Sequence, residues 1–522
     1  MKKPRLIYYN DAHHFHAKRI EPKASIHMLQ WPVDEIAGTG ADTLVLGLGY
    51  ADVYFHQTKI GRVVGQQKEV WEGYIDWRIM RMVEEADKLG TDQVREVIKR
   101  GRELDVNVIP SLKLQDPSPP GSERCGKLKW DEKEKVCIGE AGRNEWSYDF
   151  ALETVREHKL AIIEELFNDW GPDGLELDFM FGSSYFKENE AKAAEIMTAF
   201  IGDIGTLARE AGEKQDREIP IMVRVPLERE ECLAQALDVE AWFAEGSINY
   251  VVGQDGRVLS DSEPKPNWLP KAANKAGGAA YYRPPRRVYD ERVGVPSIDM
   301  TRAVSQTLRQ GGYSGLYHGY MRWPLDDAEY RFLREAAFPE VSARKIKRYM
   351  LQPREGIEGE ETSTPDRVLP AELKEGETVK ASIWVADDVQ AAKKDSEMRK
   401  PILTLRFSFF CIEDDVEFRF NGRVLPWEDA EITDERALRM ATILAGSMNL
   451  QAPLGMSAHW FRFRLDLDDV VQGENIIEAE VRKHDKRAGF KRSLNGVDIV
   501  MRYKDMERPE GFGVQRIEAP PG

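Results

Sequence analysis

The sequence predicts a (β/α)8 TIM barrel followed by an all-β sandwich. Eight short apolar runs alternate with longer amphipathic segments over roughly the first 340 residues, and beyond residue 379 strand-like runs follow one another without long helices. We therefore expect a barrel over 1–340, a linker or crossing segment over 341–378, and a β-sandwich over 379–522. A doubly wound open sheet is the alternative, but no strand is followed by a glycine-rich phosphate loop.

The eight expected barrel strands are short, and most contain β-branched or aromatic residues. They are 5–11, 41–50, 106–116, 173–180, 218–226, 247–255, 277–284 and 312–320. Helical spacing fills the gaps between them, over 75–105, 149–169, 187–212, 230–244, 297–310 and 325–338. The first of these helical segments is divided at Gly90, and Thr91 is the expected N-cap of its second part.

The segment after the barrel changes in composition. Residues 339–378 are rich in Pro, Glu and Gly and have little periodicity, which predicts a linker. Beyond it, apolar residues alternate at Phe418 and Phe420 and again at Phe461 and Phe463, which predicts strands with one buried face. The sequence FNG at 420–422 predicts a hairpin turn, as expected in a β-sandwich.

The bulk composition restricts the partners. A formal net charge of −16 argues against nucleic acid as the main partner, because phosphate binding needs a concentrated basic face. No apolar stretch has the length of a membrane span or of a signal peptide, so we expect a cytoplasmic protein with no membrane partner. Cys125 and Cys137 are expected to be free thiols rather than a disulfide. No cofactor is expected, and a homo-oligomer is left open.

Polar and aromatic residues stand at the carboxyl ends of nearly all the expected strands, where a closed core would place Val or Leu. Because chemistry in a (β/α)8 enzyme is located at these ends, we take them as candidate site residues. They are Asp11, His13, His14, Tyr50, Lys113, Glu176, Asp178, Arg224, Asp255, Tyr282, Arg283, His318 and Tyr320.

The fourth expected strand carries two carboxylates on one face. Period-two geometry places Glu176 and Asp178 inside the barrel and Leu175, Leu177 and Phe179 toward the helices. A buried carboxylate needs a countercharge, which Lys113 and Arg224 on the flanking strands can supply. A buried ion-pair network without chemistry is the alternative, with more weight for the deeper Glu176 than for Asp178.

This strand resembles the fourth strand of several barrel glycoside hydrolases, namely the α-amylase type, the α-galactosidase clan and hypothetical glycosyl hydrolases. Those families share a G-x-x-x-D pattern that ends in a catalytic aspartate, and Asp178 in DGLELDFM matches it. In the α-galactosidase clan the general acid/base is an aspartate after strand six, the position that Asp255 occupies. The resemblance covers the barrel alone, and no named family matches the whole chain.

Two departures narrow the resemblance. The chitinase pattern would require Glu where this chain has Met180, and the α-amylase type expects Glu after strand five, where this chain has Arg224. The resemblance therefore implies a glycosidase that acts on a carbohydrate with Asp178 as nucleophile or base and Asp255 as general acid. Asp255 is alternatively a turn residue, because QDG is good turn chemistry. The local run YYRPPRR at 281–287 suggests an anionic sugar, or else a solvated loop.

Three other functions compete with this one. The cluster of Asp11, His13 and His14 could hold a metal, but no histidine follows strands five or six, as the amidohydrolase barrels would need. Lys113 could form a Schiff base, although a neighbouring carboxylate would keep it charged. A non-catalytic carbohydrate-binding barrel is the third.

The long segment 116–148 is expected to form a lid or a substrate-binding excursion.

Overall fold

The computed structural model describes residues 2–18, 23–66, 68–71, 73–140, 145–182, 184–256, 259–288, 296–319, 325–353, 368–395, 398–434 and 459–504. The chain divides into two compact units, the first formed mainly by the residues up to Ser342 and the second beginning at Ala343.

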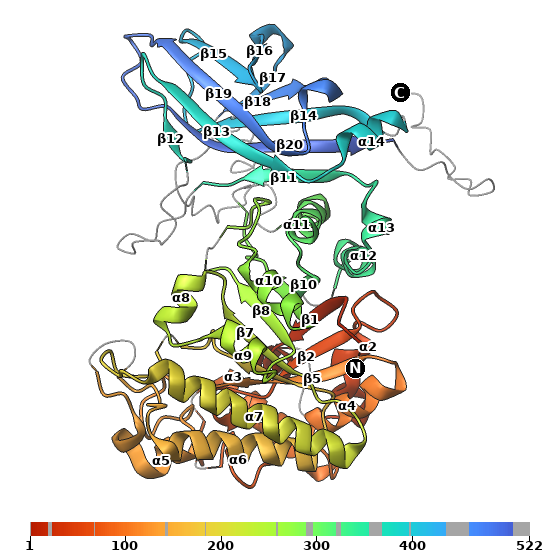
Figure 1. Ribbon diagram of the computed structural model, residues 1–522, viewed down its shortest axis with the longest axis vertical. Coiled ribbons are helices and arrows are strands. Elements are labelled where there is room, and N and C mark those ends of the chain that lie inside the picture. Colours follow the sequence, from red (N-terminus) through yellow and green to blue (C-terminus); the bar gives the residue numbers. More distant parts are fainter. Residues whose placement is uncertain are drawn as a thin grey trace, which may run out of the picture. The chain divides into compact units, whose positions relative to one another are not determined.

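The first unit contains a closed barrel of eight parallel strands, which confirms the predicted fold class (Figure 1). The strand order is β1-β2-β5-β6-β7-β8-β9-β10, and β10 closes on β1. The barrel strands are β1 (Leu6–Asn10), β2 (Thr43–Gly47), β5 (Asn107–Lys113), β6 (Leu175–Asp178), β7 (Ile221–Pro226), β8 (Tyr250–Gln254), β9 (Ala279–Arg283) and β10 (Gly315–Gly319). Each of them lies inside one of the eight runs expected from the sequence.

Helices follow the strands along the chain, and the long helices α6 and α7 pack side by side (Figure 1). The helices of this unit are α1 (Ala12–Lys18), α2 (Ile26–Asp34), α3 (Tyr74–Lys88), α4 (Gln93–Glu103), α5 (Lys127–Glu132), η1 (Lys133–Val136), α6 (Glu153–Asp169), α7 (Ala193–Gln215), α8 (Arg229–Ala234), α9 (Val239–Ala244), α10 (Trp268–Lys275), α11 (Ile298–Gln310), α12 (Asp327–Ala336) and α13 (Pro339–Ser342). A short pair, β3 (Val53–Tyr54) and β4 (Arg62–Val63), precedes α3.

Two local expectations about helices change. The N-cap of α4 is Asp92, whose side chain accepts a hydrogen bond from the Arg95 amide at 2.9 Å, whereas the expected cap, Thr91, donates its hydroxyl to Glu96. The single helix expected over 230–244 is two short helices, α8 and α9, separated at Ala236, which has a positive φ of 62°. Asp residues accept amide hydrogen bonds at N-caps as well as Thr does, so spacing alone could not choose between neighbours.

The barrel interior changes from apolar to polar along the strands. Its lower part is an apolar cluster that includes Ile7, Val45, Ile109, Met222 and Val252. The inward residues nearer the carboxyl ends are polar or charged, and strand β6 contributes Glu176 and then Asp178. Leu175, Leu177 and Phe179 belong to the cluster that packs against the helices, as predicted. Apolar side chains therefore fill one part of the barrel interior, and a polar layer lies at the carboxyl ends of the strands, where the sites of such barrels lie.

The second unit is a β-sandwich of two antiparallel sheets. One sheet has the order β11-β20-β14-β18-β17, with β12 also on β20, and the other has the order β13-β19-β15-β16. Rings from the two sheets pack against one another at tilted angles, with the Phe418 ring centre 5.7 Å from that of Phe407 and 5.5 Å from that of Phe461. The FNG turn joins β15 to β16 as predicted, with positive φ at Asn421 and Gly422.

The elements of the second unit are β11 (Lys347–Leu351), β12 (Ala371–Glu372), β13 (Thr378–Val385), α14 (Val389–Lys394), β14 (Met398–Phe407), β15 (Asp415–Phe420), β16 (Arg423–Leu425), η2 (Trp427–Asp429), β17 (Glu431–Asp434), β18 (His459–Arg464), η3 (Leu467–Asp469), β19 (Gly473–Lys483) and β20 (Ser493–Tyr503). Strand β11 lies within the segment that the sequence predicted to be a linker, and it pairs with β20 from Lys347 to Leu351. The alternation of this strand was hidden by its short length and polar neighbours.

None of the helices formed by the described residues is both long and apolar enough to cross a bilayer.

Candidate active site

Three adjacent strands bring an arginine beside two carboxylates. The register aligns Ser111 of β5 with Glu176, and Asp178 of β6 with both Lys113 of β5 and Arg224 of β7. Because residues in register on adjacent parallel strands point to the same face, these side chains all enter the barrel. The pairing of β6 with β7, more than any single motif, places Arg224 beside the carboxylates.

Arg224 is the centre of this group. Its guanidinium donates through Nη2 to Asp178 Oδ2 and through Nη1 to Gln254 Oε1 at 3.1 Å, and its Nε lies 3.6 Å from Glu176 Oε1. Arg224 is only 4% exposed, so these charges interact without bulk water between them. Burial lowers the pKa of Arg224, but Asp178 and Glu176 outweigh burial and raise it well above its ordinary value.

Two tyrosines that the sequence did not single out complete the group. The guanidinium carbon of Arg224 lies 5.0 Å from the ring centre of Tyr9 and 5.5 Å from that of Tyr317. The Tyr317 hydroxyl donates to Glu176 at 3.1 Å, and the Tyr9 hydroxyl donates to Asp11 at 3.0 Å. Gly319 leaves room for Tyr9, because an added Cβ would lie 2.7 Å from the Tyr9 Cβ. Tyr9 shares the inward parity of Asp11, two positions away, a signal that could have identified it, whereas no predicted residue of β10 has the parity of Tyr317.

Glu176 lies deeper in the barrel than Asp178, as predicted. Its Oε1 accepts hydrogen bonds from Ser111 at 2.7 Å and from Tyr317, while its Oε2 has no hydrogen-bond partner among the described residues. Burial raises the pKa of Glu176, and the nearby Asp178 raises it further, against the opposing effect of Arg224. Glu176 is therefore more easily protonated than an exposed glutamate.

This raised pKa predicts how stability depends on pH. Between the ordinary pKa of 4.5 and the raised native value, the folded protein binds more protons at Glu176 than the unfolded chain, so this residue's contribution to stability falls as pH rises. Gln cannot ionise, so in Glu176→Gln this decrease in stability with rising pH is absent. The Tm of Glu176→Gln minus that of the wild type should therefore increase with pH between about 4.5 and 8, measured by calorimetry. The exposed Glu164→Gln should show no such trend, and a difference that is flat or falling for Glu176→Gln would contradict the assignment.

Lys113 serves Asp11 and not Asp178. Its Nζ lies 3.5 Å from Asp11 Oδ2 and donates to the Gly49 carbonyl at 3.0 Å. Asp11 Oδ1 accepts from the His13 amide at 2.9 Å, while Oδ2 accepts from Tyr9. The countercharge that the sequence assigned to Lys113 and Arg224 together therefore comes, at Asp178, from Arg224. A lysine held in an ion pair is also a poor Schiff-base nucleophile.

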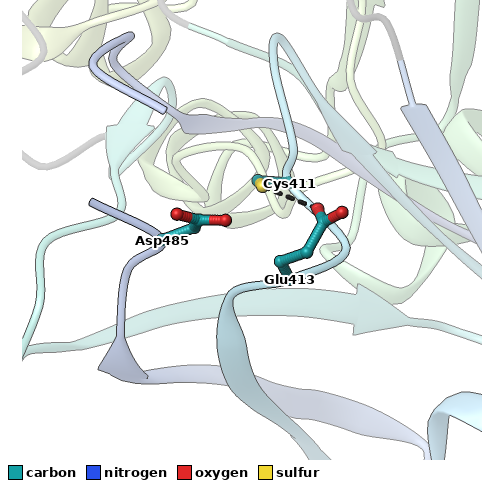
Figure 2. A group of neighbouring side chains, drawn as sticks. All are labelled: Cys411, Glu413 and Asp485. Atoms are coloured by element: carbon teal, nitrogen blue, oxygen red, sulfur yellow. Dashed lines mark hydrogen bonds between the residues drawn. The ribbon is translucent and has the colours of Figure 1, made fainter. Parts of the chain in front are cut away.

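The metal hypothesis at Asp11 and His13 gains no support from the described residues. Burial lowers the pKa of His13, against the opposing effect of Asp11, and its ring lies 5.5 Å from that of Tyr50. The side chain of His14 lies outside the described residues. Where side chains are described, the group with metal-like spacing is Cys411, Glu413 and Asp485 of the second unit (Figure 2). There the Cys411 thiol donates to Glu413 at 3.0 Å and Arg487 pairs with Asp485.

Asp255 follows β8 and is held by Tyr282. The Tyr282 hydroxyl donates to Asp255 Oδ2 at 3.1 Å, and the preceding residue, Gln254, accepts from Arg224. Tyr282 itself faces the helices and not the barrel interior, because the inward residues of β9 are Tyr281 and Arg283. The expectation that Tyr282 contacts substrate directly is therefore corrected: its ring packs in the outer core and its hydroxyl orients Asp255.

His318 also differs from the expectation. It is in register with Tyr8, which belongs to the outer core, and its ring lies 4.7 Å from that of Phe332 in α12. Burial, together with the nearby Arg286 and Arg283, lowers the pKa of His318 to about 3. The half-buried ring of His318 therefore packs toward α12. Tyr320, the other candidate on this strand, lies outside the described residues.

The excursion after β5 is firmly packed where it is described. Gln115 donates to the Tyr148 and Ser184 carbonyls at 3.0 and 2.6 Å and accepts from the Tyr148 amide at 2.7 Å. Asp116 and Lys129 form an ion pair of 3.3 Å with no exposed surface. Cys125 and Cys137 are free and buried, as expected. This packing favours a fixed wall of the barrel mouth over a lid.

Comparisons with known proteins give likenesses of fold. No protein-family model and no curated protein matches this sequence. A cycloisomaltooligosaccharide glucanotransferase from Paenibacillus sp. is 9% identical, with 96% of this chain and 57% of that chain covered and a TM-score of 0.36. A GH138 enzyme that targets pectin rhamnogalacturonan II is 12% identical, with 65% and 40% covered and a TM-score of 0.40. The glycoside hydrolase domain of PgaB (BpsB) from Bordetella bronchiseptica is 14% identical, with 66% and 98% covered and a TM-score of 0.38.

This chain thus spans 57% and 40% of the lengths of the first two of these proteins. All three TM-scores lie below 0.5, so these likenesses carry no argument about activity.

Proposed function

We propose that the protein is a glycoside hydrolase that cleaves a glycosidic bond with two carboxyl groups at the barrel mouth. The observation that carries this proposal is the buried pair of Asp178 and Arg224 at the carboxyl end of β6 and β7. A glycosidase needs a carboxylate that stays ionised at the anomeric carbon, and an adjacent guanidinium favours the ionised form. Asp178 is then the nucleophile, or the base that activates water.

Asp255 is the proposed general acid. It follows β8, two strands from β6, and Gln254 beside it shares the Arg224 guanidinium with Asp178. Asp255 would protonate the glycosidic oxygen as the bond to the leaving group breaks, and then deprotonate the water that completes hydrolysis in a retaining mechanism. Tyr282 fixes the orientation of this carboxyl.

The remaining polar residues of the mouth would bind the sugar. The buried Asp11 and the half-buried Lys113 are hydrogen-bonding groups close to Tyr9, and His13 and Tyr50 extend this side of the mouth. We include Arg283, His14 and Tyr320 in the proposed binding set from their sequence positions. Arg283 and Arg286 would favour a uronate or sulfate group on the substrate, because guanidinium groups bind such anions through paired hydrogen bonds.

Activity on a panel of aryl and oligomeric glycosides, including uronic and sulfated sugars, tests the proposal. A protein that hydrolyses none of them but binds one would support the non-catalytic barrel instead. Loss of activity on chelation, with stoichiometric metal in the purified protein, would support the metal-dependent hydrolase.

The role of Asp255 is testable through the leaving group. Asp255→Asn should lower kcat/KM by about 10²–10⁴-fold on substrates with a poor leaving group, which need a proton. It should have far less effect on dinitrophenyl glycosides, whose leaving group departs without one. Tyr282→Phe keeps the ring and should cost much less than Asp255→Asn on both substrates. Equal losses on good and poor leaving groups would contradict the acid assignment.

A further inference from the structure

An exposed aromatic surface lies on the first turn of α3. Among the described residues, three large aromatic side chains are exposed, and two of them, Tyr74 at 63% and Trp77 at 36%, are neighbours on this turn. Their rings are 6.0 Å apart and inclined by 23°, so they present nearly parallel planes. Val70 and Ile75 are also exposed. We refer to Val70, Tyr74, Ile75 and Trp77 as the aromatic platform.

The platform is connected to the barrel mouth by direct contacts. Asp76 belongs to the same helical turn and accepts a hydrogen bond from the Tyr50 hydroxyl at 2.5 Å. Tyr50 lies 5.5 Å from the His13 ring, and the His13 amide donates to Asp11. Asp11 is joined through Tyr9 to Arg224, the partner of Asp178. A chain of side-chain contacts, largely buried, therefore links the helical turn that carries the platform to the site proposed above.

Charged groups border the rings and the connection. The Arg78 guanidinium lies 6.0 Å from the Tyr74 ring centre, and that of Arg124 lies 4.4 Å from the Tyr50 ring centre and 3.9 Å from Asp76. Flat exposed rings flanked by hydrogen-bonding groups suit a ligand that has apolar C–H faces and many hydroxyls. A protein partner of ordinary affinity would bury a larger apolar area than these four side chains offer.

We propose that the aromatic platform is a remote sugar-binding subsite, and that the substrate is an oligosaccharide or polysaccharide chain that extends from Asp178 past Tyr50 to Tyr74 and Trp77. This inference rests on the proposed glycosidase function and specifies its substrate class. Binding energy gained on the platform would hold long chains and leave single sugar units unaffected.

The double variant Tyr74→Ala, Trp77→Ala tests the proposal. One control is Tyr74→Phe, Trp77→Phe, which keeps two flat rings. The other control is Phe490→Ala, which removes the exposed ring of the second unit. The probes are cello-, malto- and galacturono-oligosaccharides of one to six units, with binding followed by calorimetry and by retardation in gels that contain the polymer. The alanine variant should weaken binding of the hexamer by about tenfold or more and leave the monomer unchanged. The phenylalanine variant should recover most of the loss.

Hydrolysis separates the two proposals. If the chain is a glycosidase that uses the platform, the alanine variant raises KM for hexamers and leaves kcat on aryl monosaccharides unchanged. If the protein binds long chains but hydrolyses none of them, the proposal of a sugar-binding platform stands and the proposal of a glycosidase is wrong. Equal behaviour of wild type and alanine variant on every glycan, including no binding by either, overturns the platform. Loss of self-association in the alanine variant without any change in glycan binding also overturns it.

Discussion

Replacing Asp178 by Asn should lower kcat on glycosides by about 10³-fold or more, which corresponds to about 4 kcal/mol of transition-state stabilisation. The amide is nearly isosteric but carries no charge, so it can neither attack the anomeric carbon nor stabilise an oxocarbenium-like transition state. Arg224 keeps Glu176 as a partner, and the fold should persist. Rates with a chromogenic glycoside and a circular dichroism melt measure both effects.

The matched control is Asp173→Asn. Asp173 stands just before the same strand, at its other end, where it accepts from the Val108 amide at 2.9 Å and pairs with Arg217 at 3.0 Å. This variant loses a similar carboxylate–arginine pair far from the barrel mouth, so it should lower Tm and leave kcat unchanged. If Asp178→Asn and Asp173→Asn reduce Tm alike and both retain full activity, Asp178 is a structural ion-pair partner and not the nucleophile.

Replacing Asp116 by Ala should reduce the free energy of unfolding by about 3–5 kcal/mol, because it leaves a buried lysine without its countercharge. Asp116 and Lys129 have no exposed surface, and Asp116 also accepts from the Ser118 and Gly126 amides at 2.9 and 3.1 Å. Burial lowers the pKa of Lys129, against the opposing effect of Asp116, so the unpaired lysine would lose its proton or admit water. Urea unfolding of the barrel measures the loss.

Lys127→Ala on the same helix is the control. Its exposed partner is Asp131 at 2.5 Å, and loss of an exposed pair should cost less than about 0.5 kcal/mol. Asp116→Asn combined with Lys129→Met should recover much of the loss, since the buried charge is then absent. A loss of less than about 1 kcal/mol for Asp116→Ala would show that the excursion opens readily, as a lid would.

The sequence predicted the barrel because eight strand runs recur with helical spacing between them, and a parallel barrel is the ordinary way to bury both faces of such strands. The inward direction of Glu176 and Asp178 also followed from parity within one strand. The same alternation along the strand should have assigned Tyr282 and His318 to the outer face, but both were expected to point into the barrel. Each stands one residue from an inward position, and polarity near a strand end was taken as evidence of direction.

What the sequence determined by itself is the fold class and which strand ends carry charge. Only the tertiary structure decided the partners. Arg224 rather than Lys113 pairs with Asp178, Tyr9 and Tyr317 lie against the Arg224 guanidinium, and Tyr282 donates to Asp255 from the outer core. The physical reason is that alternation along a strand is a local property of the backbone, whereas the choice among nearby cations depends on register and side-chain packing across strands far apart in the chain.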